Sequence, residues 1–208
     1  MISPRRIAPG FLLLVPALVL AACRDVPRPI GEGVSSTPST RLGEHPPIDV
    51  AVAPVANMTG TSDGSLPAGE LREAFWWKLV DQRYSPLALD FVDKHVVDAA
   101  YKSGAPGEQA VLLVQVEKWD TSLWETHNVI SVKLTAHLVD AADGSGAAGR
   151  SGAGDLWTGK VDQRFDFGSD AEKFTTEAAR MTWACRQIAA AVLARLPARQ
   201  PKPGASSD

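Results

Sequence analysis

The histidines are the residues best suited to bind a metal or act as a catalytic base, and their spacing favours neither role. His45, His95, His127 and His137 form no i, i+4 pair and no H-E-x-x-H motif. Nucleophilic catalysis needs a nucleophile beside a base that a third group orients, and no stretch of the sequence has that pattern. The sequence therefore predicts no catalytic residue, no metal and no cofactor, and we expect a protein that is not an enzyme.

One polar loop lies where a ligand could bind. Asn57, Thr59, Thr61, Ser62 and Asp63 follow the carboxyl end of an expected strand, and open α/β sheets bind ligands at that end of their strands. The same residue types also cap helices and form turns. Two interpretations stay open: a ligand-binding loop that uses Asn57, Thr59 and Asp63, or a plain turn.

Two tryptophans flank a second polar segment. Trp119 and Trp124 lie on either side of Asp120-Thr121-Ser122, between two expected strands. Aromatic side chains in loops contribute strongly to binding when a partner buries them. One hypothesis is that these five residues bind a partner protein, and the other is that both indoles fold back over a sheet edge.

The two cysteines have different expected roles. Cys185 continues a helical stripe with Phe174, Ala178, Met181, Ile188 and Val192, so we expect a buried thiol that packs as a small apolar group. Cys23 ends the segment Leu20-Ala21-Ala22-Cys23, which resembles the signal of bacterial lipoproteins, in which the cysteine is acylated, for example with palmitate, and becomes the first residue.

The residues before Cys23 also predict export. Arg5 and Arg6 precede an apolar run at 11–22, which is too short for a transmembrane helix of about 20 residues. Arg24 follows the cysteine in place of aspartate, as in lipoproteins sent to the outer membrane. The alternative is an ordinary secretory signal with an incidental cysteine. We expect a lipid-anchored protein with no transmembrane helix after processing, whose domain faces the periplasm.

Composition divides the chain into four parts. Residues 1–22 form the signal peptide, and residues 23–47 form an acylated cysteine with a flexible tether rich in proline and glycine. Residues 48–197 form one folded domain, and residues 198–208 form a disordered tail. The sequence pI of about 5.8 gives no reason to expect nucleic-acid binding.

The hydrophobic pattern of the domain predicts a mixed α/β fold. Continuous apolar runs at 48–55 and 110–116 indicate central strands, with a helix through about 82, a short strand at 87–89 and a helix at 91–102 between them. This βαβαβ order favours parallel pairing. Alternation at 129–139 and 156–165 then indicates an antiparallel hairpin, joined by a glycine-rich insertion at 141–154 that lacks the lysine of a phosphate-binding loop, and a C-terminal helix follows at 171–196. We expect two or three layers around one sheet.

Three segments resemble a known family. EKWDTSLWE (117–125), ISVKLTAHLVD (130–140) and DLWTG (155–159) are similar to small bacterial outer-membrane lipoproteins of unknown function, of the neisserial surface-antigen type. That family also begins with a lipoprotein signal and a strand like IDVAVAP. The resemblance implies a fold like the amino-terminal domain of TolB and the domains of CsgG, LpoB and PelC.

The resemblance implies no catalytic residue, but it does suggest a role. It implies a non-enzymatic envelope protein that binds other envelope proteins or copies of itself, as part of an export or assembly complex. One alternative is an LpoB-like activator of a peptidoglycan synthase, which a long tether would help to reach through the cell wall. The other is a small-ligand-binding or enzymatic domain that uses the 57–63 loop. Pore formation is disfavoured, because 141–154 lacks the alternating apolar residues of a membrane hairpin.

Overall fold

A computed structural model of the protein describes residues 29–30, 33–44, 46–60, 66–97, 100–101, 104, 107–143 and 155–200. The predicted signal peptide, Cys23 and residues 201–208 lie outside this set. The strands are β1 (Pro29–Ile30), β2 (Val34–Pro38), β3 (Asp49–Val52), β4 (Ala56–Asn57), β5 (Ser85–Pro86), β6 (Val96–Val97), β7 (Ala100–Tyr101), β8 (Ala110–Asp120), β9 (Val129–Asp140) and β10 (Asp155–Asp166). The helices are α1 (Thr40–Glu44), α2 (Ala68–Asp81), α3 (Leu89–Asp93), α4 (Trp124–His127) and α5 (Glu177–Leu193), with 3-10 turns η1 (Ala141–Asp143) and η2 (Gly168–Lys173).

The first part of the main sheet is parallel. β3 lies between β5 and β8 and runs parallel to both, with Val50 opposite Pro86 on one side and Ala110 on the other. α2 connects β3 to β5, and α3 lies between β5 and β8 in the chain. This confirms the predicted βαβαβ start with parallel pairing, but the second strand is β5 at 85–86 and not 87–89, because Leu89 already begins α3.

The second part of the sheet is antiparallel. β8, β9 and β10 form a long meander in which Ala136 of β9 lies opposite Val114 and Gly159. The predicted alternation is confirmed in β9, where every second side chain is buried: Ile130, Val132, Leu134, Ala136 and Leu138. Position 159 requires glycine because the Trp157 ring lies directly over its backbone. A Cβ at this position would be 2.1 Å from that ring.

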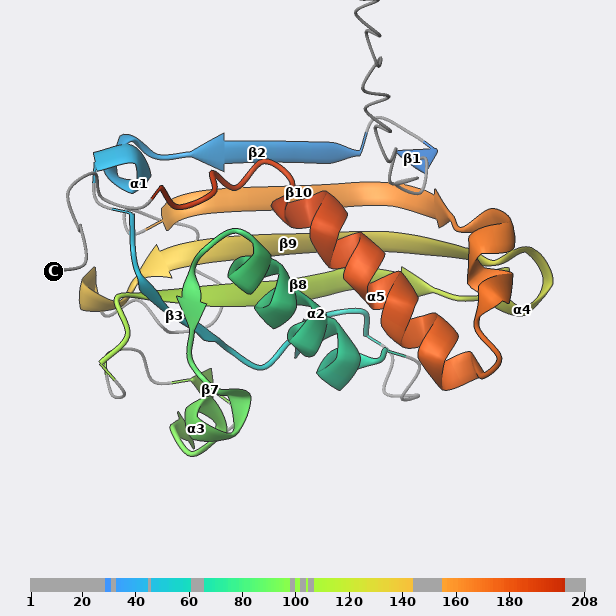
Figure 1. Ribbon diagram of the computed structural model, residues 1–208, viewed down its shortest axis with the longest axis horizontal. Coiled ribbons are helices and arrows are strands. Elements are labelled where there is room, and N and C mark those ends of the chain that lie inside the picture. The colour runs from blue at the N-terminus through green and yellow to red at the C-terminus, as the bar shows by residue number, and fades with distance from the viewer. Residues whose placement is uncertain are drawn as a thin grey trace, which may run out of the picture.

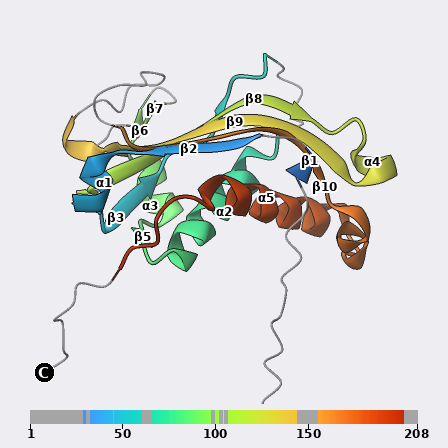
Figure 2. The same ribbon diagram turned by 90° about the horizontal axis from the view of Figure 1, so that it is seen from above.

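The layers differ along the sheet. Figure 1 looks onto the face that α2 and α5 cover, and Figure 2 shows both helices on one side of the sheet. Between them and the sheet lies the main core, which includes Phe75, Leu112, Leu138, Trp157 and Ile188. On the other face, residues of α3 and β7 pack in a smaller cluster with the parallel strands: Val92, Tyr101, Ala51 and Val111. The domain therefore has three layers at its parallel end and two over the antiparallel strands.

The C-terminal helix begins later than the sequence predicts. Residues 168–173 form the η2 turn, and α5 starts after Thr176, whose side chain accepts a hydrogen bond from the backbone N–H of Ala179 at 3.2 Å. Cys185 is fully buried on the inner face of α5, as expected. Burial raises the pKa of its thiol to about 12, so the thiolate is scarce at neutral pH.

The predicted tether is wrong for residues 29–30, which pair with β10 as β1, and for residues 33–44. β2 pairs with β10 in five positions, from Val34 opposite Val161 to Pro38 opposite Trp157, and α1 follows it with Leu42 buried in the main core. Composition misleads here because this strand is held by backbone hydrogen bonds, which need no large apolar side chains. At the other end, Arg199 donates its backbone N–H to the carbonyl of Gln82 at 2.9 Å.

The predicted helix at 91–102 is also wrong. α3 ends at Asp93, and Val96 and Val97 then pair antiparallel with Tyr101 and Ala100. The two β-branched valines favour this extended hairpin over a continued helix.

Candidate functional site

The polar loop after β3 is held by its own side chains. The side-chain oxygen of Asn57 accepts the backbone N–H of Thr59 at 3.0 Å and its hydroxyl at 2.7 Å. This is the geometry of an Asx turn. Thr61, Ser62 and Asp63 lie outside the described residues. The described part of the loop supports the interpretation as a turn, and ligand binding by it stays a prediction.

The sheet position where ligands usually bind is closed by an ion pair. The chain passes from β3 through α2 to β5 on one side of β3, and then through α3 back to β8 on the other side, so the topological switch point lies at the carboxyl ends of β3 and β8. Arg72 of α2 reaches across this end. Its Nε donates to the Val52 carbonyl at 3.0 Å, and its Nη1 lies 2.5 Å from Asp93 Oδ1 of α3. Arg72 and its partner on α3 therefore lie across the carboxyl end of β3.

The two tryptophans of the 119–124 segment are not exposed. Trp119 is 8% exposed and Trp124 only 2%. Trp124 begins α4 and packs edge-on against Phe167 at 5.8 Å, while the Arg180 guanidinium lies 4.8 Å from its ring centroid. The premise of an exposed aromatic pair is therefore wrong, and both indoles fold back onto the domain.

The polar residues between these tryptophans form a tight turn. Asp120 Oδ1 accepts the backbone N–H of Ser122 at 3.0 Å, and this bond lowers the pKa of the Asp120 carboxyl. The Thr121 carbonyl accepts the backbone N–H of Trp124 at 2.9 Å, which starts α4. Whether Asp120, Thr121 and Ser122 contact a partner stays a prediction.

The structure brings together one polar cluster that the sequence did not predict. On the face of the sheet opposite α2 and α5, His137 Nδ1 lies 2.9 Å from Asp155 Oδ2, and the Thr158 hydroxyl donates to the same oxygen at 3.1 Å. In a catalytic triad the acid and the nucleophile form hydrogen bonds with different nitrogens of the histidine ring. Here Thr158 Oγ1 is 3.3 Å from Nδ1 as well, so the cluster lacks that geometry. No three His, Cys, Asp or Glu side chains of the described chain are grouped to hold a metal.

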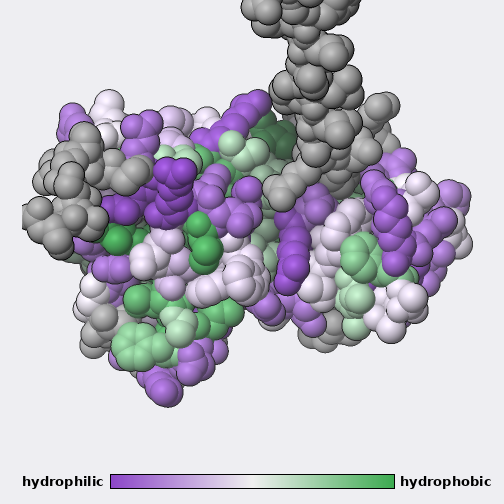
Figure 3. Space-filling model, in the orientation of Figure 1, coloured by the Kyte–Doolittle hydropathy of each residue, from purple (hydrophilic) through white to green (hydrophobic). Residues whose placement is uncertain are grey.

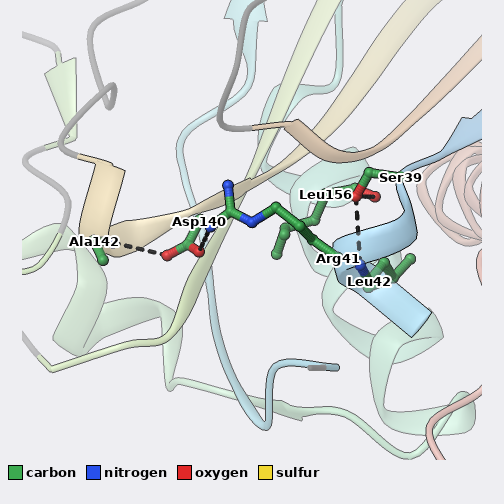
Figure 4. Close-up of polar contacts among 6 residues, drawn as sticks. All are labelled: Ser39, Arg41, Leu42, Asp140, Ala142 and Leu156. Carbon is green, nitrogen blue, oxygen red and sulfur yellow. Dashed lines mark hydrogen bonds and ion pairs between the residues drawn. The ribbon is translucent and has the colours of Figure 1, made fainter. Parts of the chain in front are cut away.

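A second group of contacts fastens α1 to the far end of the meander, as Figure 4 shows. Ser39 donates its backbone N–H at 2.9 Å and its hydroxyl at 3.0 Å to the Leu156 carbonyl. Arg41 forms an ion pair of 2.5 Å with Asp140, whose other oxygen accepts the Ala142 backbone N–H at 2.9 Å. These bonds join residues about a hundred positions apart in the chain, and they hold the N-terminal segment on the domain.

A hollow of about 830 Å³ lies beside these contacts. Glu108, which is 5% exposed, lines it and accepts the Tyr101 hydroxyl at 2.8 Å and the Gly104 backbone N–H at 2.6 Å. Burial raises the pKa of the Tyr101 hydroxyl. The carboxylate therefore serves to hold the chain between β7 and β8.

Another hollow among the described residues is a groove of about 1000 Å³ between α2, α5 and η2. Three aromatic side chains line it, with charged residues at its rim and alanines along α5: Trp77, Phe174, Trp183, Lys78, Asp81, Lys173, Arg186, Ala190 and Ala194. Trp77 is 46% exposed and donates its indole N–H to Glu73 at 3.1 Å. In Figure 3 the strongly hydrophobic side chains gather lower down, over α3, while the surface between α2 and α5 is mostly pale or purple. The groove thus combines aromatic rings with a polar rim.

None of the helices in the described part of the chain has the length and apolar character of a membrane span. No protein-family model matches the sequence, and no curated protein matches it. The fold is similar to solved structures of small bacterial proteins. A PelC dodecamer from Paraburkholderia phytofirmans is 18% identical with a TM-score of 0.48, and the match covers 80% of this chain and 98% of that one.

Two further similarities are of the same kind. Lipoprotein GNA1162 from Neisseria meningitidis is 18% identical with a TM-score of 0.41, over 69% of this chain and 97% of that one. The hypothetical protein CT253 from Chlamydia trachomatis is 13% identical with a TM-score of 0.44, over 72% and 95%. At these values no residue's role transfers to this chain.

Proposed function

We propose that this protein is an outer-membrane lipoprotein, acylated at Cys23, whose domain binds other envelope proteins as a non-enzymatic part of an export or assembly complex. The segment Leu20-Ala21-Ala22-Cys23, after two arginines and a short apolar run, supports the lipid anchor. The absence of a triad-like or metal-binding arrangement among the described residues gives no support to an enzyme.

The aromatic groove between α2 and α5 is the observation that carries the binding role. Protein interfaces concentrate their energy in a few aromatic and arginine side chains near the centre, with a polar rim around them. Trp77 and Trp183 provide such rings, and Arg186 lies beside them. The occupant we propose is a protein of the same envelope, and the groove replaces the 119–124 segment as the expected contact surface.

The test is a pull-down from detergent-solubilised membranes, combined with native mass spectrometry of the acylated protein. The wild type should co-purify with a partner or with further copies of itself, and Trp77→Ala should lose that complex. Phe91→Ala is the matched control, since Phe91 is 40% exposed on α3, outside the groove. A wild-type protein that is monomeric and binds no partner would overturn the proposal. Equal losses of the complex in Trp77→Ala and Phe91→Ala would show that the groove is not the binding surface.

A further inference from the structure

The folded body of the protein begins much closer to the predicted anchor than composition suggests. β1 already pairs with β10, with Pro29 opposite Phe165 and Ile30 opposite Arg164. Gly33 then approaches β10 so closely that a Cβ would lie 2.2 Å from the Asp162 carbonyl oxygen, and its own carbonyl accepts the Asp162 backbone N–H at 2.9 Å. Residues 29–30 and Gly33 are therefore already attached to the sheet.

Only five residues separate Cys23 from Pro29. A fully extended chain advances at most about 3.6 Å per residue, so the six steps from Cys23 to Pro29 reach about 22 Å at most. A tether that continued to residue 47 would reach several times further. The shorter length does not allow the domain to stand far from a bilayer that holds Cys23.

The attachment point also selects one end of the molecule. Pro29 lies opposite Phe165, and Phe165 lies opposite Ile130, close to the end of α4. Pro38, at the start of the α1 region, lies opposite Trp157. These positions are separated by eight residues of β10, or about 26 Å at about 3.3 Å per residue. Figure 1 shows β1 near the α4 end of the sheet and α1 at the opposite end.

The α4 end is polar. The large hydrophobic side chains with substantial exposure among the described residues are Ile48, Met58, Trp77, Val80 and Phe91. None of them belongs to α4, η2 or β10, and Met58, bonded through its backbone N–H to Val116 of β8, is the one that lies toward the α4 end. Exposed residues at this end include Glu125, Thr126 and His127 of α4 and Asp166 of β10. Burying such polar side chains among acyl chains would cost free energy, so this surface suits the hydrated headgroup layer and not insertion into the hydrocarbon.

We propose that the lipid anchor holds the α4 end of the domain against the headgroup surface of the bilayer, and that any partner lies in or on that same membrane. The inference rests on the proposed acylation of Cys23. It also removes the reason for the LpoB-like alternative, because a chain of five residues cannot carry the domain through a cell wall.

The experiment uses the acylated full chain in phospholipid vesicles. A donor dye is attached at Thr126→Cys on α4 or, as the matched control, at Glu44→Cys on α1, while buried Cys185 stays unlabelled. Energy transfer to an acceptor on the lipid headgroups should be greater from residue 126 than from residue 44. A Gly-Ser insert of about twelve residues after Arg24 should cause a loss of transfer from residue 126.

The outcomes separate this inference from the proposed function. Protein that does not float with the vesicles would show that the anchor itself is absent, which overturns both. Protein that floats but gives equal transfer from the two positions, or a transfer that the insert does not change, would overturn the membrane-facing α4 end and leave the lipid anchor standing.

Discussion

Replacing Trp124 with alanine tests whether this residue is part of the core or part of a binding surface. Its ring is 2% exposed, packs edge-on against Phe167 and lies under the Arg180 guanidinium. Removing a buried tryptophan costs about 3–5 kcal/mol. Because a domain has about 5–15 kcal/mol of stability in total, the variant should be close to unfolding at physiological temperature.

The size of the effect can be measured by thermal and urea unfolding, followed by far-UV circular dichroism. A loss of about 3–5 kcal/mol corresponds to a fall in Tm of about 6–20 °C for a chain of this length. Trp124→Phe should recover much of the loss, because it keeps a ring and the indole N–H has no acceptor among the described residues. Any loss of partner binding in Trp124→Ala then follows from unfolding.

The matched control is Trp77→Ala, because Trp77 is 46% exposed on α2. Its substitution should change the free energy of unfolding by no more than about 1 kcal/mol. The reasoning is refuted if Trp124→Ala and Trp77→Ala have the same stability, or if Trp124→Ala stays fully folded and loses only its partner. In either case the α4 packing would contribute little to the fold.

Three further predictions concern the core, the number of reactive thiols and the pH dependence of stability. Gly159→Ala should destabilise the protein by about 1–3 kcal/mol in urea unfolding, because the added Cβ collides with Trp157. The control is Gly69→Ala in α2, which has open space around it and should be neutral or stabilising by up to about 1 kcal/mol. Equal effects of the two substitutions would contradict the Trp157 contact. In the native acylated protein at pH 8, a thiol reagent should label no cysteine, because Cys185 is buried. In denaturant it should label one thiol per chain, because acylated Cys23 is a thioether. Two labelled thiols per chain would refute the acylation of Cys23. Because burial raises the pKa of the Cys185 thiol from 9.0 to about 12, its contribution to stability is complete below pH 9 and is lost as the pH rises toward 12, so the urea midpoint should fall over that range and fall less in Cys185→Ala.

The sequence predicts those strands and helices in which burial of one or both faces produces a regular spacing of hydrophobic residues. β8 begins with a continuous apolar run because its first residues are covered on both faces, and β9 alternates because one face is open to water. The parallel order followed from the helices between the strands. Each of these signals is local, so one sequence was enough to find it.

The parts that were missed depend on contacts between distant residues. β2 is short, made of small polar residues and mostly exposed, so pairing with β10 leaves no hydrophobic pattern in it. The sequence likewise cannot tell an exposed tryptophan from Trp124, whose burial depends on Phe167 and α5. The His137–Asp155 contact joins residues on two strands, and only their register brings them together.

The attachment of the N-terminal segment and the helical groove together restrict what a partner can be. Arg180, near the start of α5, contacts Glu125 of α4, so this helix begins at the end we propose to face the lipid. Ala194, which lines the groove, lies fourteen residues further along, or about 21 Å at about 1.5 Å per residue. In the proposed orientation the groove would therefore extend away from the headgroups, toward the water-exposed part of a membrane protein or a second anchored copy. If both molecules are anchored in one bilayer, as we propose, confinement raises their effective concentration, and a groove with only a few aromatic contacts would then be enough for a stable complex.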